Sequence, residues 1–156
     1  MKKCMQTAKL LIRRFTAADR ALYLDMAEAF YHSPAVLKPI PRSYLERTFD
    51  EMMRSDVYVD GFLLEYGGEP AGYMLIAKTF SQEPGGLAIW VEELSILEPF
   101  QRKGLGSEAL KWVKARYPDC RRIRLEVERD NERAIRLYER LGYEELKYYQ
   151  MVWDAQ

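Results

Sequence analysis

Residues 101–107 read Gln-Arg-Lys-Gly-Leu-Gly-Ser, and they separate a β-prone run at 87–97 from an amphipathic segment that begins at Gly104. Gly104 and Gly106 allow the backbone to approach a ligand closely, because they carry no Cβ atom. The free N–H groups in the first turn of a helix attract anions. The stretch therefore predicts a strand, a turn and a helix, with a phosphate bound at the turn.

The same glycines also match a variant of the dinucleotide-binding fingerprint, Gly-x-Gly-x-x-Ala, which ends at Ala109. Glu126 stands 20 residues after Gly106, where that fingerprint expects an acidic residue. In a dinucleotide-binding fold, however, the first glycine closes the strand directly, whereas residues 98–103 intervene here. Only roughly 50 residues follow the turn, too few for the further strands of a doubly wound sheet. These two facts disfavour a dinucleotide site.

The remaining elements follow from hydrophobic periodicity and turn residues. Thr16 and Asp19 can cap a helix, and they precede apolar positions that recur every four residues, which predicts that helix. Residues 67–70 (Gly-Gly-Glu-Pro) predict a hairpin turn. The expected elements, in chain order, are strand Leu10–Phe15, a helix with Leu22, Met26 and Phe30 on one face, helix Ser43–Arg54, strands Val57–Tyr66, Ala71–Phe80 and Leu87–Leu97, helix Gly104–Arg116, strand Arg122–Val127, helix Glu132–Leu141 and a final β segment through Trp153.

This order, β-α-α-β-β-β-α-β-α-β, predicts an α/β (α+β) fold with a mixed, mostly antiparallel central sheet and helices on both faces. A helix connects the strands at 87–97 and 122–127, so these two strands are expected to pair in parallel. The length of 156 residues indicates a single domain over residues 1–156.

Composition argues against several classes of protein. The 24 Lys and Arg balance 24 Asp and Glu, so nucleic acid is not an expected partner. No apolar run exceeds five residues, so neither a membrane span nor membrane attachment is expected. The N-terminal residues lack the apolar segment of a secretory signal, and we expect a cytoplasmic protein.

Metal catalysis and a serine triad are also disfavoured. Cys4 and Cys120 lie 116 positions apart, and His32 is the single histidine, so no zinc-ligand spacing can be assembled. No Gly-x-Ser-x-Gly elbow presents a serine nucleophile. We therefore expect no metal.

Two consecutive acids, Glu92 and Glu93, interrupt the apolar strand at 87–97. Burial of an unpaired carboxylate is costly, so at least one of them must reach water or a cation. An edge or a bulge that exposes both acids explains them equally well at this point. In the last helix, Asn131 is placed to cap the N-terminus and Gly142 to end it. Tyr138 lies on its apolar stripe, where a core role and a role in proton transfer both stay open.

Taken together, these segments resemble the GCN5-related N-acetyltransferases. The resemblance rests on Gln-x-x-Gly-x-Gly at 101–106 behind the strand end at 93–96, followed by Asn131, Ala134, Leu137-Tyr138 and Leu141-Gly142-Tyr143. It implies that acetyl-coenzyme A is the co-substrate and that it binds where the strands at 87–97 and 122–127 splay apart.

The resemblance also implies a role for each site residue. Tyr138 falls on the position of the general acid; Glu92 is the expected base and Glu93 the charge that orients the amine. Tyr31 and His32 are expected to border the acceptor site. The residues expected to bind the coenzyme are Leu94, Ser95, Ile96, Gln101, Arg102, Lys103, Gly104, Leu105, Gly106, Ser107 and Asn131.

The function that follows is transfer of an acetyl group from acetyl-coenzyme A to a primary amine of a small molecule, by direct attack in a ternary complex. A protein N-terminus is an alternative acceptor. A non-catalytic module that binds or senses acetyl-coenzyme A stays open, and so does a homodimer; a dinucleotide-binding protein is the least supported alternative.

Overall fold

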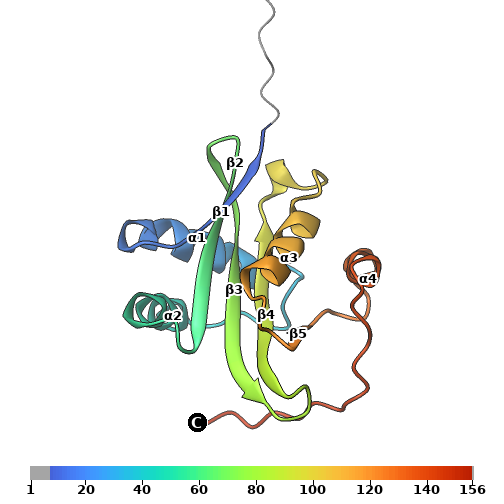
Figure 1. Cartoon of the computed structure of the whole chain (residues 1–156). Coiled ribbons are helices and arrows are strands. Elements are labelled where there is room, and N and C mark those ends of the chain that lie inside the picture. The colour runs from blue at the N-terminus through green and yellow to red at the C-terminus, as the bar shows by residue number, and fades with distance from the viewer. Residues whose placement is uncertain (1–7, 156) are drawn as a thin grey trace, which may run out of the picture.

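The computed structural model describes residues 8–155 and contains one five-stranded sheet with the order β1-β2-β3-β4-β5 (Figure 1). Neighbouring strands pair antiparallel except for β4 and β5, which pair parallel, as the sequence predicted. The strands are β1 (Leu10–Arg14), β2 (Val59–Tyr66), β3 (Glu69–Ser81), β4 (Gly86–Ile96) and β5 (Arg122–Leu125); the helices are α1 (Arg20–Tyr31), α2 (Arg42–Arg54), α3 (Leu105–Arg116) and α4 (Glu132–Arg140), with short 3-10 turns η1 (Ala17–Asp19) and η2 (Glu98–Phe100).

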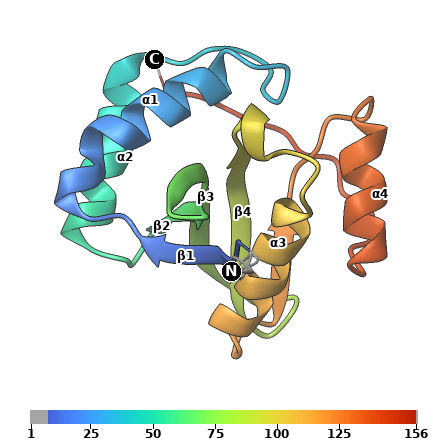
Figure 2. The ribbon, with the colours of Figure 1, turned by 90° about the horizontal axis from the view of Figure 1, so that it is seen from above.

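Helices cover both faces of the sheet (Figure 2). One core cluster joins α1 and α2 to the sheet through residues such as Tyr23, Phe49 and Tyr73. The other cluster joins α3 to the opposite face and also takes in Tyr138 from α4. Each face thus has its own apolar core, which agrees with the predicted helices on both faces.

The boundaries of the last two helices follow from capping. Gly104 precedes α3 in the left-handed region, with φ of 79°, and this conformation favours glycine. The Asn131 Oδ1 atom accepts a hydrogen bond from the Ala134 N–H at 3.1 Å, so Asn131 caps α4 as predicted. Gly142 follows α4 with φ of 84°, the usual geometry for ending a helix.

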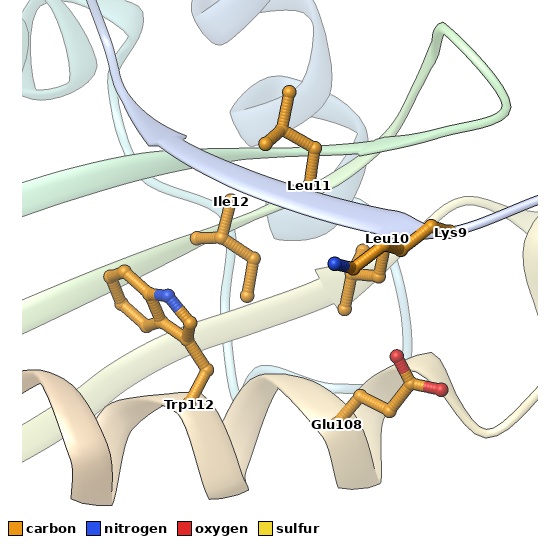
Figure 3. A pocket seen from close by; sticks show the side chains of 6 residues that line it. All are labelled: Lys9, Leu10, Leu11, Ile12, Glu108 and Trp112. Carbon is orange, nitrogen blue, oxygen red and sulfur yellow. The ribbon is translucent and has the colours of Figure 1, made fainter.

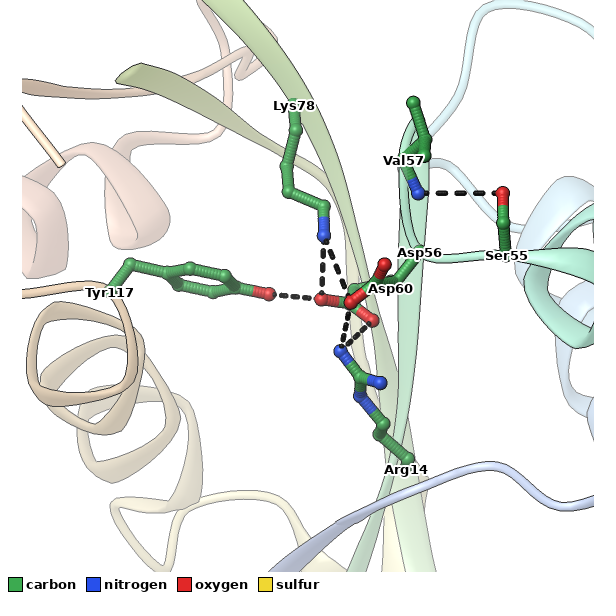
Figure 4. Close-up of polar contacts among 7 residues, drawn as sticks. All are labelled: Arg14, Ser55, Asp56, Val57, Asp60, Lys78 and Tyr117. Carbon is green, nitrogen blue, oxygen red and sulfur yellow. Dashed lines mark hydrogen bonds and ion pairs between the residues drawn. The ribbon is translucent and has the colours of Figure 1, made fainter. Parts of the chain in front are cut away.

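A buried carboxylate ties the sheet to α3 (Figure 4). Asp60 on β2 accepts a hydrogen bond from the Tyr117 hydroxyl at 2.8 Å. Its carboxylate also lies 2.8 Å from the Arg14 guanidinium on β1 and 3.1 Å from Lys78 Nζ on β3. Asp60 is 3% exposed, and these partners satisfy it where an unpaired charge would be costly.

Two expectations about the C-terminal part were wrong. Strand β5 ends at Leu125 rather than at Val127. The final β segment through Trp153 is absent, because residues 143–155 form no ladder with the sheet. Tyr149 and Trp153 are largely exposed there. A strand depends on a paired neighbour more than on its own composition, and this segment has none.

Candidate active site

A β-bulge in β4 decides where the two acids point. Val91 pairs with Ile76 and Glu93 pairs with Leu75, so Glu92 is an extra residue without a partner on β3. Before the bulge, Ile89 and Val91 face the core under α3; after it, Leu94 and Ile96 face that same core. The bulge therefore turns Glu93 to the α1–α2 face, away from Val91.

Glu93 is buried between two tyrosines. The Tyr31 hydroxyl, from the last residue of α1, donates to Glu93 Oε1 at 2.7 Å. The Tyr73 hydroxyl, from β3, donates to Oε2 at 2.5 Å. Glu93 is 7% exposed, and burial raises its pKa although both hydrogen bonds act in the opposite direction. Its carboxyl is thus firmly positioned but costly to ionise.

Glu92 lies in a different environment. The residue is exposed, in contrast to Glu93. Partial burial of its carboxyl raises its pKa, and repulsion from Glu126 adds to this shift. A carboxylate with a raised pKa that still reaches solvent is suited to accept a proton near neutral pH.

The parallel strands part directly at the bulge. The last β4–β5 pair is Val91 with Leu125, whereas β4 continues to Ile96. Within residues 8–155, residues 94–96 pair with a strand on the β3 side only, so an extended ligand could pair with their other edge beside the Ile96 carbonyl. The Gln101 side-chain amide donates to the Ile96 carbonyl at 2.9 Å and fixes the path of the chain into the turn. The expected splay is therefore present.

The turn at 101–104 has an unusual backbone. Arg102 adopts a φ of 63°, and it is the one non-glycine residue in the described chain with positive φ. Left-handed residues in such a turn direct successive N–H groups to one side, which creates a concave site for anions. The exposed side chains of Arg102 and Lys103 add positive charge. These features fit a pyrophosphate at the N-terminus of α3.

Gly106 lies in the first turn of α3 and faces α4. A Cβ atom at this position would stand 3.8 Å from the Leu137 side chain, an ordinary contact. The fold itself therefore does not require this glycine. Leu105 and Ser107 beside it are buried and half-buried, respectively.

Tyr138 is half-buried on α4, and its ring meets Tyr143 edge-to-face at 6.0 Å. Burial raises the pKa of its phenol, which therefore keeps its proton at neutral pH. The side chain belongs to the core under α3 and has the chemistry of a proton donor.

The structure separates the two residues expected to border the acceptor site and adds a tyrosine that the sequence analysis did not single out. Tyr31 does reach the acid pair, whereas His32 is exposed and its Nδ1 lies 2.7 Å from the Glu28 carbonyl oxygen. Tyr73 was missed. Antiparallel pairing of the hairpin 57–80 with 87–97 predicts that some β3 side chains lie next to the acids, but the bulged register that selects Tyr73 has no local signal.

Two cavities lie away from these residues. One, of about 250 Å³, separates β1 from α3, with Trp112 and Glu108 facing Leu10 and Ile12 (Figure 3). The other, of about 410 Å³, lies between the start of β5 and the residues that follow α4. The second is lined by Gly142 and Tyr143 of the family motif, but neither cavity is lined by a residue expected to act in catalysis or to bind the coenzyme or the acceptor.

Residues 8–155 contain neither a cluster of metal-ligating side chains nor a helix that could span a membrane. No group of three or more His, Cys, Asp and Glu is arranged to hold a metal ion there. In the same part of the chain, no helix combines the length and apolar character needed to cross a membrane. Cys4 lies outside the described residues.

The structure thus gives an α/β fold in which two strands part beside an acidic bulge, with a glycine turn before the next helix. The chain matches the model of the acetyltransferase (GNAT) family over residues 20–143 and belongs to that family. This confirms the resemblance seen in the sequence. Acetyl-coenzyme A is the co-substrate of this family, as the sequence predicted.

A curated relative is the spermine/spermidine N(1)-acetyltransferase of Bacillus subtilis (strain 168), which is 31% identical over 86 residues. The match covers 52% of this chain and 57% of that protein, so the chain spans little more than half the length of this relative.

Solved structures share the fold over nearly the whole chain. A possible acetyltransferase from Clostridium difficile 630 has a TM-score of 0.80 at 15% identity, covering 94% of this chain and 98% of that chain. AAC(6')-Iy, in complex with the bisubstrate analogue CoA-S-monomethyl-acetylneamine, has a TM-score of 0.76 at 13% identity, covering 95% and 99%. At these identities the likeness shows the fold alone.

Proposed function

We propose that the protein transfers the acetyl group of acetyl-coenzyme A to a primary amine of a small molecule, by direct attack in a ternary complex. The observation that carries this proposal is the bulge at Glu92, which presents an acid where β4 and β5 part. Bulges commonly re-aim a side chain beside an active site. The name of the Bacillus subtilis relative supports an amine as the acceptor.

The coenzyme would bind along the free edge of β4 and at the turn before α3. Backbone groups of residues 94–96 pair with its pantetheine arm, and the amides of residues 102–107 hold its pyrophosphate. Gln101 keeps the turn beside the strand end. Asn131 contacts the coenzyme from the α4 side while its Oδ1 caps that helix.

The acids prepare the amine. A primary ammonium has a pKa near 10.4 and no free lone pair, so it must lose a proton before it can attack. Glu92, directly or through water, accepts that proton, while Glu93 orients the ammonium by its charge. The nitrogen then forms a bond to the thioester carbonyl carbon as the C–S bond breaks, and the nitrogen releases its second proton to water.

The remaining groups stabilise the charges that develop. The backbone N–H of Leu94 donates to the carbonyl oxygen as it becomes negative. The Tyr138 phenol gives its proton to the departing thiolate. Burial favours the neutral form of Tyr138, so the phenol is protonated at the start of each turnover.

A thiol-release assay tests this function. The purified protein, acetyl-coenzyme A and a panel of polyamines, aminoglycosides, small alkylamines and peptides with free N-termini are mixed, and the product is identified by mass. We expect acetylation of at least one small primary amine above the rate with alcohols. If only the peptides are acetylated, the acceptor is a protein N-terminus and not a small molecule.

The main alternative is a module that binds acetyl-coenzyme A without catalysis. Tight binding of acetyl-coenzyme A with no acetylated product across the panel would favour that alternative. Tighter binding of NAD than of acetyl-coenzyme A would favour a dinucleotide site, but a sheet with a single parallel pair argues against it.

A further inference from the structure

The Glu93 carboxyl has hydrogen-bond donors on both oxygens but no cation. Within residues 8–155 its partners are the phenols of Tyr31 and Tyr73, and it takes part in none of the ion pairs there. A buried carboxylate normally requires a cation beside it. Each carboxylate oxygen accepts about two hydrogen bonds. One acceptor position on each oxygen is therefore left for a ligand.

Aromatic rings surround this carboxyl. Phe30 lies 5.5 Å from the Tyr31 ring and 6.2 Å from the Tyr73 ring, measured between centroids, and both pairs are close to perpendicular. Tyr23 packs against Tyr73 at 5.8 Å on the inner side. Faces of aromatic rings attract organic cations, and the attraction is stronger when water is excluded. A carboxylate among such rings suits an alkylammonium better than a metal ion.

The two phenols differ in how they can respond to a ligand. Tyr73 is fully buried on β3, at the centre of the sheet, so its hydroxyl is a fixed donor. Tyr31 is half-buried at the end of α1, where the chain turns into the connection to α2. Negative charge near Glu93 comes from Glu92 beside it, so a cation entering from the Tyr31 side is attracted by both acids.

We propose that Tyr31 and Tyr73 are positioning residues that hold Glu93 as the receptor for the ammonium group of the acceptor. This inference rests on the proposed function and names the part of the site that selects its amine. Tyr73 fixes one carboxylate oxygen, and Tyr31 fixes the other.

The test compares Tyr31→Phe and Tyr73→Phe with Tyr44→Phe, a matched change at an exposed tyrosine on α2. The acceptor is the best amine of the panel. Loss of a hydrogen bond to a charged group should raise the KM for the amine about tenfold in each of the first two variants. The kcat and the KM for acetyl-coenzyme A should change less than twofold, and Tyr44→Phe should match the wild type.

A pH profile separates positioning from a structural role. Removal of a donor to the carboxylate makes Glu93 harder to ionise, so the acidic limb of kcat/KM for the amine should move to higher pH in both variants. In Glu93→Gln, ionisation of residue 93 should no longer affect the acidic limb of kcat/KM for the amine. Unchanged KM values and unchanged limbs in Tyr31→Phe and Tyr73→Phe would overturn the proposal.

Equilibrium binding keeps the proposal testable if no amine is acetylated. Butylammonium chloride is titrated into the wild type and into Glu93→Gln, with butanol and tert-butylammonium as comparisons, and binding is followed by NMR. Saturable binding of butylammonium that is lost in Glu93→Gln supports the receptor even where the transfer reaction fails. Equal binding of butylammonium to both proteins would refute it.

Discussion

At the scale of single residues, the two adjacent glutamates lie in different environments because Glu92 is the extra residue of the bulge and Glu93 is paired with β3 after it. Glu92 is exposed beside Glu126, whereas Glu93 is buried against two phenols. Burial raises the pKa of both carboxyls, but only Glu92 combines a raised pKa with access to water. The base and the ammonium receptor are thus assigned by position rather than by residue type.

Substitution of Glu92 tests the base. In the wild type, kcat should rise with pH through the raised pKa of Glu92, because only the carboxylate accepts a proton. In Glu92→Gln we expect kcat to fall by roughly 10²–10⁴, with a rate that increases toward the pKa of the amine near 10.4. Glu126→Gln is the control, since loss of its charge should lower the pKa of Glu92 and move the acidic limb to lower pH. Identical pH–rate profiles for the wild type and Glu92→Gln would exclude this base.

Tyr138 can be tested with little disturbance of packing. The Tyr138→Phe variant keeps the ring against Tyr143 and removes the proton donor. Turnover should fall by roughly 10²–10⁴, while the affinity for acetyl-coenzyme A stays within twofold. Steady-state rates and equilibrium binding measure the two effects. Full turnover in Tyr138→Phe would assign Tyr138 to the core alone.

At the scale of elements, the start of α3 shows a glycine that the fold does not need. Ala at position 106 would make an ordinary contact with Leu137, and alanine is about 1 kcal/mol more favourable than glycine within a helix. Gly106→Ala should therefore unfold at an equal or higher urea concentration, yet bind acetyl-coenzyme A at least tenfold more weakly if the backbone must approach the pyrophosphate. Gly72→Ala provides the contrast, because its Cβ would overlap the Ser95 carbonyl oxygen and must disturb the sheet. If Gly106→Ala binds acetyl-coenzyme A with unaltered affinity, the proposal that the pyrophosphate binds at this turn is wrong.

The elements also show how far the sequence alone could lead. Periodicity and capping predicted α2, α3 and α4 to within one residue, because their signals are local. The contact of Tyr73 with Glu93 depends on the register between β3 and β4, which no local pattern specifies. The expected strand through Trp153 was wrong because β propensity acts only when a neighbouring strand accepts the pairing.

At the scale of the whole molecule, the Asp60 network joins three strands and the residue that follows α3, far along the chain from the acids of the site. Tyr117→Phe removes one donor from a buried carboxylate, so the free energy of unfolding should fall by about 1–3 kcal/mol in urea denaturation. Acetyl transfer by the folded protein should be unchanged. Tyr58→Phe, at a largely exposed tyrosine, should leave both quantities unchanged. A loss of activity without loss of stability in Tyr117→Phe would show that this network belongs to the site.

The bulge in β4 has a consequence for how this protein can change by deletion. Without Glu92, the pairs Ile76–Val91 and Leu75–Glu93 would follow each other directly in the ladder between β3 and β4. Side chains of β4 would then alternate between the two faces of the sheet without interruption from Ile89 to Ile96. Loss of this one codon should therefore give a protein that folds and binds acetyl-coenzyme A but transfers acetyl groups at least 10² more slowly.

Deletion of Trp90 should have the opposite outcome, because it puts Ile89 and Val91 on opposite faces and spoils the core. Far-UV circular dichroism, coenzyme binding and turnover of the two deletion variants distinguish these cases. If the chain without Glu92 fails to fold, the extra residue is required for the fold. If it folds and still binds acetyl-coenzyme A, a single in-frame deletion is enough to abolish acetyl transfer while the fold and coenzyme binding are kept.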